Sequence, residues 1–232
     1  MEKYKYILFD VDGTLLDFFV AERNAIKKLF VKFGFGEITD EKCRVYSRIN
    51  KEYWDKLERN EMTKAEILVG RFRDFFSYLG IDTSFAEEFN KEYQECLGDT
   101  VVFCENSKEI VEELKKKYTL AIITNGTKIA QKKKLKNSGF DKLFDHIYIS
   151  ENIGIEKPNK GFFDYVEKDL GVEETKKVLV IGDSLNSDIL GGINMGADTC
   201  WYNPKGAANT RGIVPTYEIK SLNEIYKIVD RG

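Results

Sequence analysis

The sequence is poor in residues on which several large classes of protein chemistry depend. It contains a single histidine, His146, so a mechanism built on several histidines is excluded. Its four cysteines, Cys43, Cys96, Cys104 and Cys200, form no C-x-x-C pair, and without a secretory signal a disulfide framework has little support. Catalysis in this chain would therefore have to rely on carboxylates, lysines and hydroxyl groups.

An excess of one charge and a long apolar run are also missing. The 36 Lys and Arg residues are interleaved with 39 Asp and Glu residues, and the net charge is -3. Without a basic field, binding of a nucleic acid polymer is disfavoured. No apolar stretch approaches the roughly 20 residues of a membrane span, and "MEKYKYILFD" leads into an apolar segment without a signal peptide. We therefore expect a cytoplasmic protein without a membrane partner, and a monomer by default.

The apolar residues that are present fall into short runs separated by helix-like segments. The 232 residues are 42% hydrophobic, enough for one large domain or for one domain that carries an insertion. The runs that end in polar residues are "YKYILFD", "YTLAIITNG", "DHIYIS", "KKVLVIGDS" and "ADTCWYN". Because strands that alternate with helices are typical of βαβ units, we predict an α/β fold with a parallel sheet wound by helices on both faces.

The pattern changes after the first predicted strand, where apolar residues recur at helical spacing and no strand is convincing. The segments with this spacing are 18–33, 41–57, 64–79 and 85–97. A stretch of this length exceeds an ordinary connection. We therefore predict an α/β core formed by residues 1–17 and 99–232, interrupted by an all-helical insertion at residues 18–98.

The first predicted strand, in "ILFDVDGTLLD", ends in two acids one residue apart, Asp10 and Asp12. Burying a carboxylate at the end of such an apolar run costs several kcal/mol unless a metal or another cation compensates its charge. The pair therefore predicts a cationic partner. The composition of average proteins makes D-x-D-G-T rare, at roughly one chance occurrence in several hundred chains of this length.

Further polar residues follow the other predicted strands. Thr124 and Asp183 end two of them, Asp188 lies five residues beyond Asp183, and Lys157 lies in the loop after "HIYIS". In an open α/β sheet ligands bind outside the carboxyl ends of the strands, so we expect these groups to face one crevice. "TNGT" joins a hydroxyl, an amide and a glycine at a strand-to-helix turn, where free backbone N-H groups favour an anion such as phosphate.

The segments "DVDGT", "ITNG", "KP" and "GDSLNSD", in this order, resemble the four motifs of the haloacid dehalogenase superfamily. The resemblance spans essentially the whole chain and implies a Rossmann-like core with a helical cap. It also implies a Mg²⁺-dependent phosphatase in which Asp10 attacks phosphorus and forms an aspartyl-phosphate. Asp12 would protonate the leaving oxygen and then activate water. The dehalogenase branch of the superfamily lacks an acid at the Asp12 position, so dehalogenation is disfavoured.

The same resemblance assigns the remaining roles. Asp10, the carbonyl of Asp12 and Asp183 would bind Mg²⁺, and Asp188 would hold a metal-bound water or Lys157. The phosphoryl oxygens would be held by Thr124, Asn125, Lys157 and backbone amides. Elementary chemistry agrees, because Mg²⁺ prefers one or two carboxylates together with substrate phosphate. A carboxylate that attacks an anionic phosphate also needs its charge repulsion cancelled, which Mg²⁺ and a lysine can do.

The substrate has to be selected by the insertion, because the core motifs contact only the phosphoryl group and the metal. "KPNKGFFDYV", "SDILGGINMGADTCWYNP" and "TKAEILVGRF" resemble stretches of the YjjG-type nucleotidases, which implies nucleoside 5'-monophosphates as substrates, with pyrimidines preferred. Three alternatives remain: a sugar-phosphate phosphatase or a phosphomutase of the same superfamily, and a non-catalytic phospho-receiver. We further expect the insertion to close over the site and restrict it to small phosphorylated metabolites.

Overall fold

The computed structural model describes residues 3–230, which form two compact units. The first, here called the α/β unit, comprises the described residues up to Asp17, Phe103–Lys128, and the described residues from Ser138 onward. The second, the helical unit, comprises Phe18–Val102 and Ile129–Asn137. Each unit has its own core and is described by itself.

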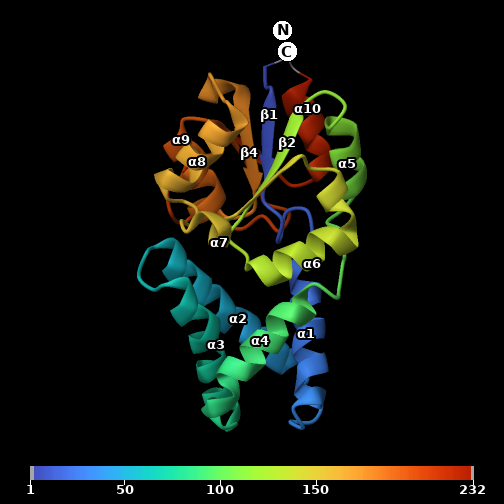
Figure 1. The fold of residues 1–232 in the computed structure, drawn as a ribbon, viewed down its shortest axis with the longest axis vertical. Coiled ribbons are helices and arrows are strands. Elements are labelled where there is room, and N and C mark those ends of the chain that lie inside the picture. Colours follow the sequence, from blue (N-terminus) through green and yellow to red (C-terminus); the bar gives the residue numbers. More distant parts are fainter. Residues whose placement is uncertain (1–2, 231–232) are drawn as a thin grey trace. The chain divides into compact units, whose positions relative to one another are not determined.

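A six-stranded parallel sheet forms the centre of the α/β unit, with the strand order β3-β2-β1-β4-β5-β6 (Figure 1). The strands are β1 (Tyr6–Phe9), β2 (Thr119–Thr124), β3 (His146–Ile149), β4 (Val178–Gly182), β5 (Asp198–Tyr202) and β6 (Tyr217–Ile219). The five strands predicted from apolar runs are all present. Strand β6 was not predicted, because its three residues are too few to show a pattern.

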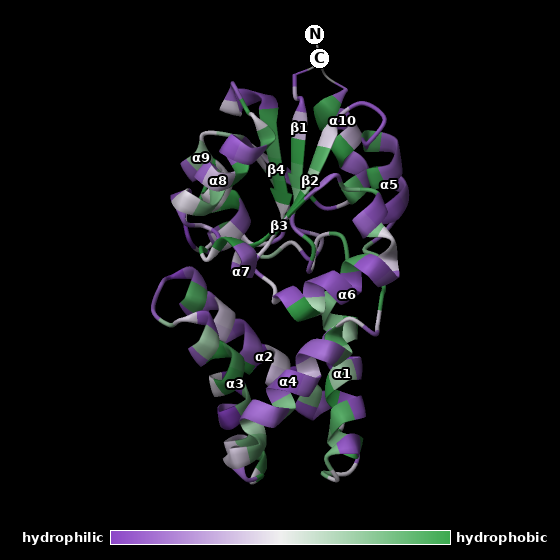
Figure 2. Ribbon diagram, in the orientation of Figure 1, coloured by the Kyte–Doolittle hydropathy of each residue, from purple (hydrophilic) through white to green (hydrophobic). Residues whose placement is uncertain are grey.

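Helices cover both faces of this sheet, as predicted for a doubly wound fold. In Figure 1, α8 and α9 lie on one side of the strands, whereas α5 and α10 lie on the other. The helices of the unit are α5 (Ser107–Leu114), α7 (Ser150–Ile153), α8 (Lys160–Leu170), α9 (Leu190–Met195) and α10 (Ile225–Val229). Figure 2 shows the central strands in the colour of hydrophobic residues, which is expected for strands buried on both faces.

The register of the sheet brings three chain segments to one edge. Phe9, the last residue of β1, pairs with Ile122 of β2 and with Ile181 of β4. The next residue, Asp10, donates its backbone N-H to the Ile181 carbonyl at 2.9 Å. The polar residues that follow β1, β2 and β4 therefore lie at the same carboxyl edge of the sheet, which is where α/β folds bind ligands.

The helical unit contains four long helices and the middle of a fifth. They are α1 (Phe18–Lys32), α2 (Asp40–Glu58), α3 (Lys64–Leu79), α4 (Ala86–Leu97) and α6 (Lys128–Ser138). The first four agree with the predicted segments to within one residue. Among the helices of residues 3–230, none combines the length and the apolar character that crossing a membrane requires.

Residues 129–137 fall in the helical unit, although their sequence position suggested the α/β core. The reason is packing: Ala130 belongs to the hydrophobic cluster of α1 to α4, and Lys133 forms an ion pair with Asp99. The α/β unit likewise resumes at Phe103, four residues after the predicted boundary.

An aromatic core holds the helical unit together. Phe72, Phe76 and Phe89 are fully buried, and their ring centroids lie 5.0 to 6.1 Å apart, a spacing at which aromatic pairs attract one another. Helix α3, which carries two of these rings, begins with reciprocal hydrogen bonds between Thr63 and Glu66 that satisfy two free backbone N-H groups. Most aromatic side chains of the insertion thus serve the core.

A network of polar side chains crosses this aromatic core. The buried Glu22 carboxylate of α1 accepts hydrogen bonds from Ser47 and, at 2.7 Å, from Asn50 of α2. Asn50 in turn accepts from the buried guanidinium of Arg71 at 2.7 Å, and Arg71 reaches Asn90 of α4 at 3.1 Å. Burial raises the pKa of Glu22 to about 7, and its hydrogen bonds and the Arg71 charge offset this only in part.

The two chain segments of the α/β unit that flank the long helical insertion lie next to each other. Leu16 forms an isolated antiparallel bridge with Phe103, and the Cys104 backbone N-H donates to the Leu15 carbonyl at 3.0 Å. The hydroxyl of Ser107, at the start of α5, donates to the same carbonyl at 2.7 Å. Hydrogen bonds within the α/β unit therefore join the chain before the insertion to the chain after it.

Replacing Glu22 by Gln should stabilise the protein more at pH 8 than at pH 5. Folding raises the pKa of the Glu22 carboxyl group from 4.5 to about 7. The free-energy cost of ionising this group in the folded protein is therefore absent below pH 4.5 and fully present above about pH 7. Its size is on the order of 3 kcal/mol. Thermal unfolding of both proteins at the two pH values measures it. The exposed Glu88→Gln serves as control, and an equal Glu22→Gln effect at both pH values would contradict the prediction.

Candidate active site

A buried lysine lies at the centre of the polar groups at the carboxyl edge of the sheet. The Lys157 side chain is 1% exposed, and its ammonium donates to Asp10 Oδ1 at 2.8 Å and to Asp188 Oδ1 at 2.7 Å. A third bond, at 2.8 Å, goes to the backbone carbonyl of Ile123 in β2. Burial alone would lower the pKa of Lys157, but the two carboxylates outweigh it and raise the pKa above its ordinary value. The lysine is therefore held as a cation.

Asp10 is also buried, and the Lys157 ammonium offsets only part of the effect of this burial on the Asp10 pKa. Burial raises the pKa of Asp10 to about 7, Lys157 opposes this, and the charges of Asp188 and Asp12 add to it. The carboxylate form of Asp10 is therefore disfavoured when Lys157 is the cation beside it. A further cation beside it would restore the carboxylate form.

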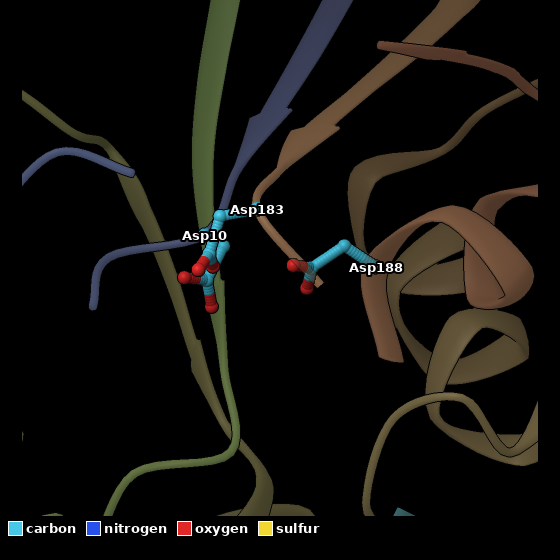
Figure 3. Close-up of side chains that lie close together, drawn as sticks. All are labelled: Asp10, Asp183 and Asp188. Carbon is cyan, nitrogen blue, oxygen red and sulfur yellow. The ribbon is translucent and has the colours of Figure 1, made fainter. Parts of the chain in front are cut away.

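Three carboxylates converge at this point. Figure 3 shows the side chains of Asp10 and Asp183 close together and that of Asp188 pointing toward them. One carboxylate oxygen from each lies within 4.8 Å of the others. Three carboxylates and the Lys157 ammonium meet here, and the donor atoms that a metal would bind are all hard oxygens. Such a set fits Mg²⁺, which Asp10 and Asp183 would bind.

Asp188 differs from the other two because its oxygens are already engaged. Asp188 lies in the short π-helical turn Leu185–Ile189 that follows β4. Besides the Lys157 ammonium, its carboxylate accepts the backbone N-H of Ser184 at 3.1 Å. Ser184 itself caps this turn by accepting the Ser187 N-H at 3.2 Å. These bonds fix the Asp188 carboxylate beside the Lys157 ammonium.

Glycines allow the acids to approach so closely. Gly13 has a φ of +94°, and a Cβ on it would lie 2.6 Å from Asp183 Oδ2. A Cβ on Gly182 would lie 2.2 Å from Asp188 Oδ2. Any larger residue at either position would displace a carboxylate, so the two glycines help to define the site.

Thr124 ends strand β2, as predicted from the sequence, whereas the side chain of Asn125 has partners that the sequence did not indicate. The buried Thr124 hydroxyl oxygen accepts the Gly126 N-H at 3.0 Å, which leaves its own hydrogen available for an anion. The Asn125 side chain, predicted to hold phosphate, bonds to the backbone of Lys157 through both ends of its amide, each at 2.8 Å. Asp12 is partly exposed, and its charge acts on Asp10.

Sequence reasoning missed one residue that supports the site. The indole N-H of the buried Trp201, on β5, donates to the Asp183 backbone carbonyl at 2.9 Å. Nothing in "ADTCWYN" indicates this contact, because it depends on β5 lying beside β4 in the sheet. Partners of this kind orient a metal ligand without touching the metal.

Comparison with known proteins places the chain among characterised relatives. Residues 7–202 match the model of the haloacid dehalogenase-like hydrolases. The pyrimidine 5'-nucleotidase PynA of Streptococcus pneumoniae is 35% identical, over 99% of this chain and 96% of its own length. The pyrimidine 5'-nucleotidase YjjG of Escherichia coli is 30% identical, over 98% of both chains.

A solved structure has the same fold throughout. It is the crystal structure of YfnB from Bacillus subtilis, which is bound to magnesium. The two structures superpose with a TM-score of 0.93 at 35% sequence identity, over 98% of this chain and 99% of YfnB. The match supports both the sheet topology and the helical insertion.

The close approach of Gly13 to Asp183 yields a test of the metal site. Gly13→Ala should weaken Mg²⁺ binding about 10- to 100-fold, because the added methyl group displaces the Asp183 carboxylate. Gly154→Ala is the matched control, since Gly154 has a similar φ of +80° but no atom within 4 Å of the place that an added methyl group would occupy. Calorimetric titration with Mg²⁺ measures both. Equal losses in the two variants would attribute the effect to backbone strain and not to Asp183.

Proposed function

Because the chain belongs to the haloacid dehalogenase-like hydrolases, we propose that it hydrolyses phosphate monoesters through Asp10, with pyrimidine nucleoside 5'-monophosphates as substrates. The observation that carries the substrate class is the full-length similarity to two proteins named pyrimidine 5'-nucleotidases. The chemistry rests on the convergence of Asp10, Asp183 and Lys157 at one edge of the sheet.

Asp10 is the proposed nucleophile. One of its carboxylate oxygens attacks phosphorus, the bond from phosphorus to the nucleoside 5'-oxygen breaks, and an aspartyl-phosphate forms. Lys157 orients this carboxylate by holding Oδ1 at 2.8 Å. When bound by Asp10, Asp183 and the Asp12 carbonyl, Mg²⁺ supplies positive charge that offsets the repulsion between carboxylate and phosphate.

Asp12 is the proposed proton carrier. It gives its proton to the leaving 5'-oxygen, so the nucleoside departs as an alcohol, and it then takes a proton from the water that attacks the aspartyl-phosphate. The second step releases inorganic phosphate and restores both carboxyl groups. The Thr124 hydroxyl and backbone amides of the turn after β2 would hold the phosphoryl oxygens.

Small phosphorylated metabolites are the proposed partners. The interleaved charges of the chain offer no extended basic surface for a polynucleotide. A sugar-phosphate phosphatase of the same family uses the same groups around phosphorus, so the choice between it and a nucleotidase depends on measured selectivity. A phosphomutase would return the phosphoryl group to a sugar and would not release free phosphate.

Asp10→Asn should abolish turnover while the protein remains folded. Asparagine keeps the oxygen that accepts from Lys157 but is no nucleophile. Asp12→Asn should lower kcat by about 10²- to 10⁴-fold through loss of proton transfer. Phosphate release and thermal unfolding are measured in parallel, with the exposed Asp141→Asn as control. Full activity of a folded Asp10→Asn protein would refute the mechanism.

Substrate selectivity is tested with a panel of phosphate monoesters. Pyrimidine nucleoside 5'-monophosphates should give a higher kcat/KM than purine nucleotides and hexose phosphates when phosphate release is followed with Mg²⁺ present. Chelation should stop the release. A preference for sugar phosphates by about tenfold, which is about 1.4 kcal/mol in transition-state binding, would replace the nucleotidase assignment while leaving the mechanism in place.

A further inference from the structure

The side chain of Asn125 makes a two-point contact with the backbone of a single residue. Its Nδ2 donates to the Lys157 carbonyl, and its Oδ1 accepts the Lys157 backbone N-H, each at 2.8 Å. Asn125 follows β2 and is 9% exposed, whereas Lys157 lies in the loop between α7 and α8. The contact joins two segments 32 residues apart.

The backbone of Lys157 has no strand or helix to hold it. It lies between Ile153, the end of α7, and Lys160, the start of α8. Because buried backbone groups without a partner are costly, the Asn125 amide replaces the bonds that regular structure would otherwise provide.

The position of this backbone matters because the ammonium at the far end of the side chain is tightly constrained. Its three N-H bonds are directed at Asp10, Asp188 and the Ile123 carbonyl, all between 2.7 and 2.8 Å. A lysine has a long, flexible stem, so a shift at its backbone would misalign the ammonium with these acceptors. The geometry of the nucleophile thus depends on where the Lys157 backbone lies.

We propose that Asn125 is a positioning residue that acts through Lys157, holding its ammonium between Asp10 and Asp188. The kinetic part of this inference rests on the proposed phosphatase function. A carboxamide presents a donor and an acceptor side by side, which matches one residue's N-H and C=O. Aspartate could accept the N-H but would repel the carbonyl, and alanine could do neither.

The alternative is that Asn125 contacts the phosphoryl group directly, through the second hydrogen on Nδ2. The two roles predict different couplings. A positioning residue loses its effect once the Lys157 ammonium is removed, whereas a direct phosphate contact keeps its effect in that background.

The first experiment needs no activity. Amide hydrogen exchange of Lys157 is measured by NMR in the full-length protein, in Asn125→Ala and in the nearly isosteric Asn125→Asp. Exchange should be at least about tenfold faster in both variants, because the N-H loses its partner or its loop loosens. Asn203→Ala is the matched control: Asn203 makes the same two-point contact with Ala207, at 3.0 and 2.8 Å. It should leave Lys157 exchange unchanged. Unchanged exchange in both Asn125 variants overturns the proposal.

The second experiment measures kinetics and phosphate affinity. With rates normalised to the fraction of folded protein, Asn125→Ala should lower kcat by about tenfold or more with a change in KM below about threefold. Inorganic phosphate, titrated with Mg²⁺ present, should then bind Lys157→Met and the double variant Lys157→Met/Asn125→Ala equally. A weaker affinity of the double variant would assign Asn125 to direct phosphate contact and overturn the proposal. A wild-type protein that releases no phosphate from any monoester would refute the proposed function, while the exchange result would still decide the role of Asn125.

Discussion

The burial of the Lys157 ammonium between Asp10 and Asp188 is the constraint on which the arrangement of the site depends. A buried cation is tolerated only with charged partners and full hydrogen bonding, and Lys157 has both. The groups that meet it come from three different strand ends, so the parallel sheet must be correctly assembled before the charges are compensated. Because three carboxylates meet around this one ammonium, the site suits a divalent cation.

Much of the fold and of the site could be predicted from local sequence. Strands buried on both faces appear as continuous apolar runs, and the helices of the insertion show regular apolar spacing, so both were recognised. Asp10, Thr124 and Asp183 could be placed at one edge because each directly follows a strand. In a parallel sheet the carboxyl ends of neighbouring strands are necessarily close.

Other features could not be predicted, because they depend on contacts between distant segments. The contact of the Asn125 amide with the backbone of Lys157 could not be foreseen, because it joins residues 32 positions apart and Lys157 lies in a loop without regular structure. Trp201 contacts Asp183 only because β5 lies beside β4. Residues 129–137 continue directly from a strand of the α/β unit but pack in the helical one. Hydrophobic spacing shows that a helix buries one face; it does not show against which neighbour.

The bridge between Leu16 and Phe103 has a consequence for how such a protein can change over evolutionary time. Because the α/β unit joins the two ends of the interruption with its own hydrogen bonds, the inserted segment forms a module, which packs in addition with residues 129–137. The entropy of closing a loop grows slowly with its length, by only about 0.6 kcal/mol for each doubling. Recombination that keeps the packing with residues 129–137 could therefore lengthen or shorten the module at little cost in loop-closure entropy. New substrate ranges would then arise while the phosphoryl chemistry stays the same.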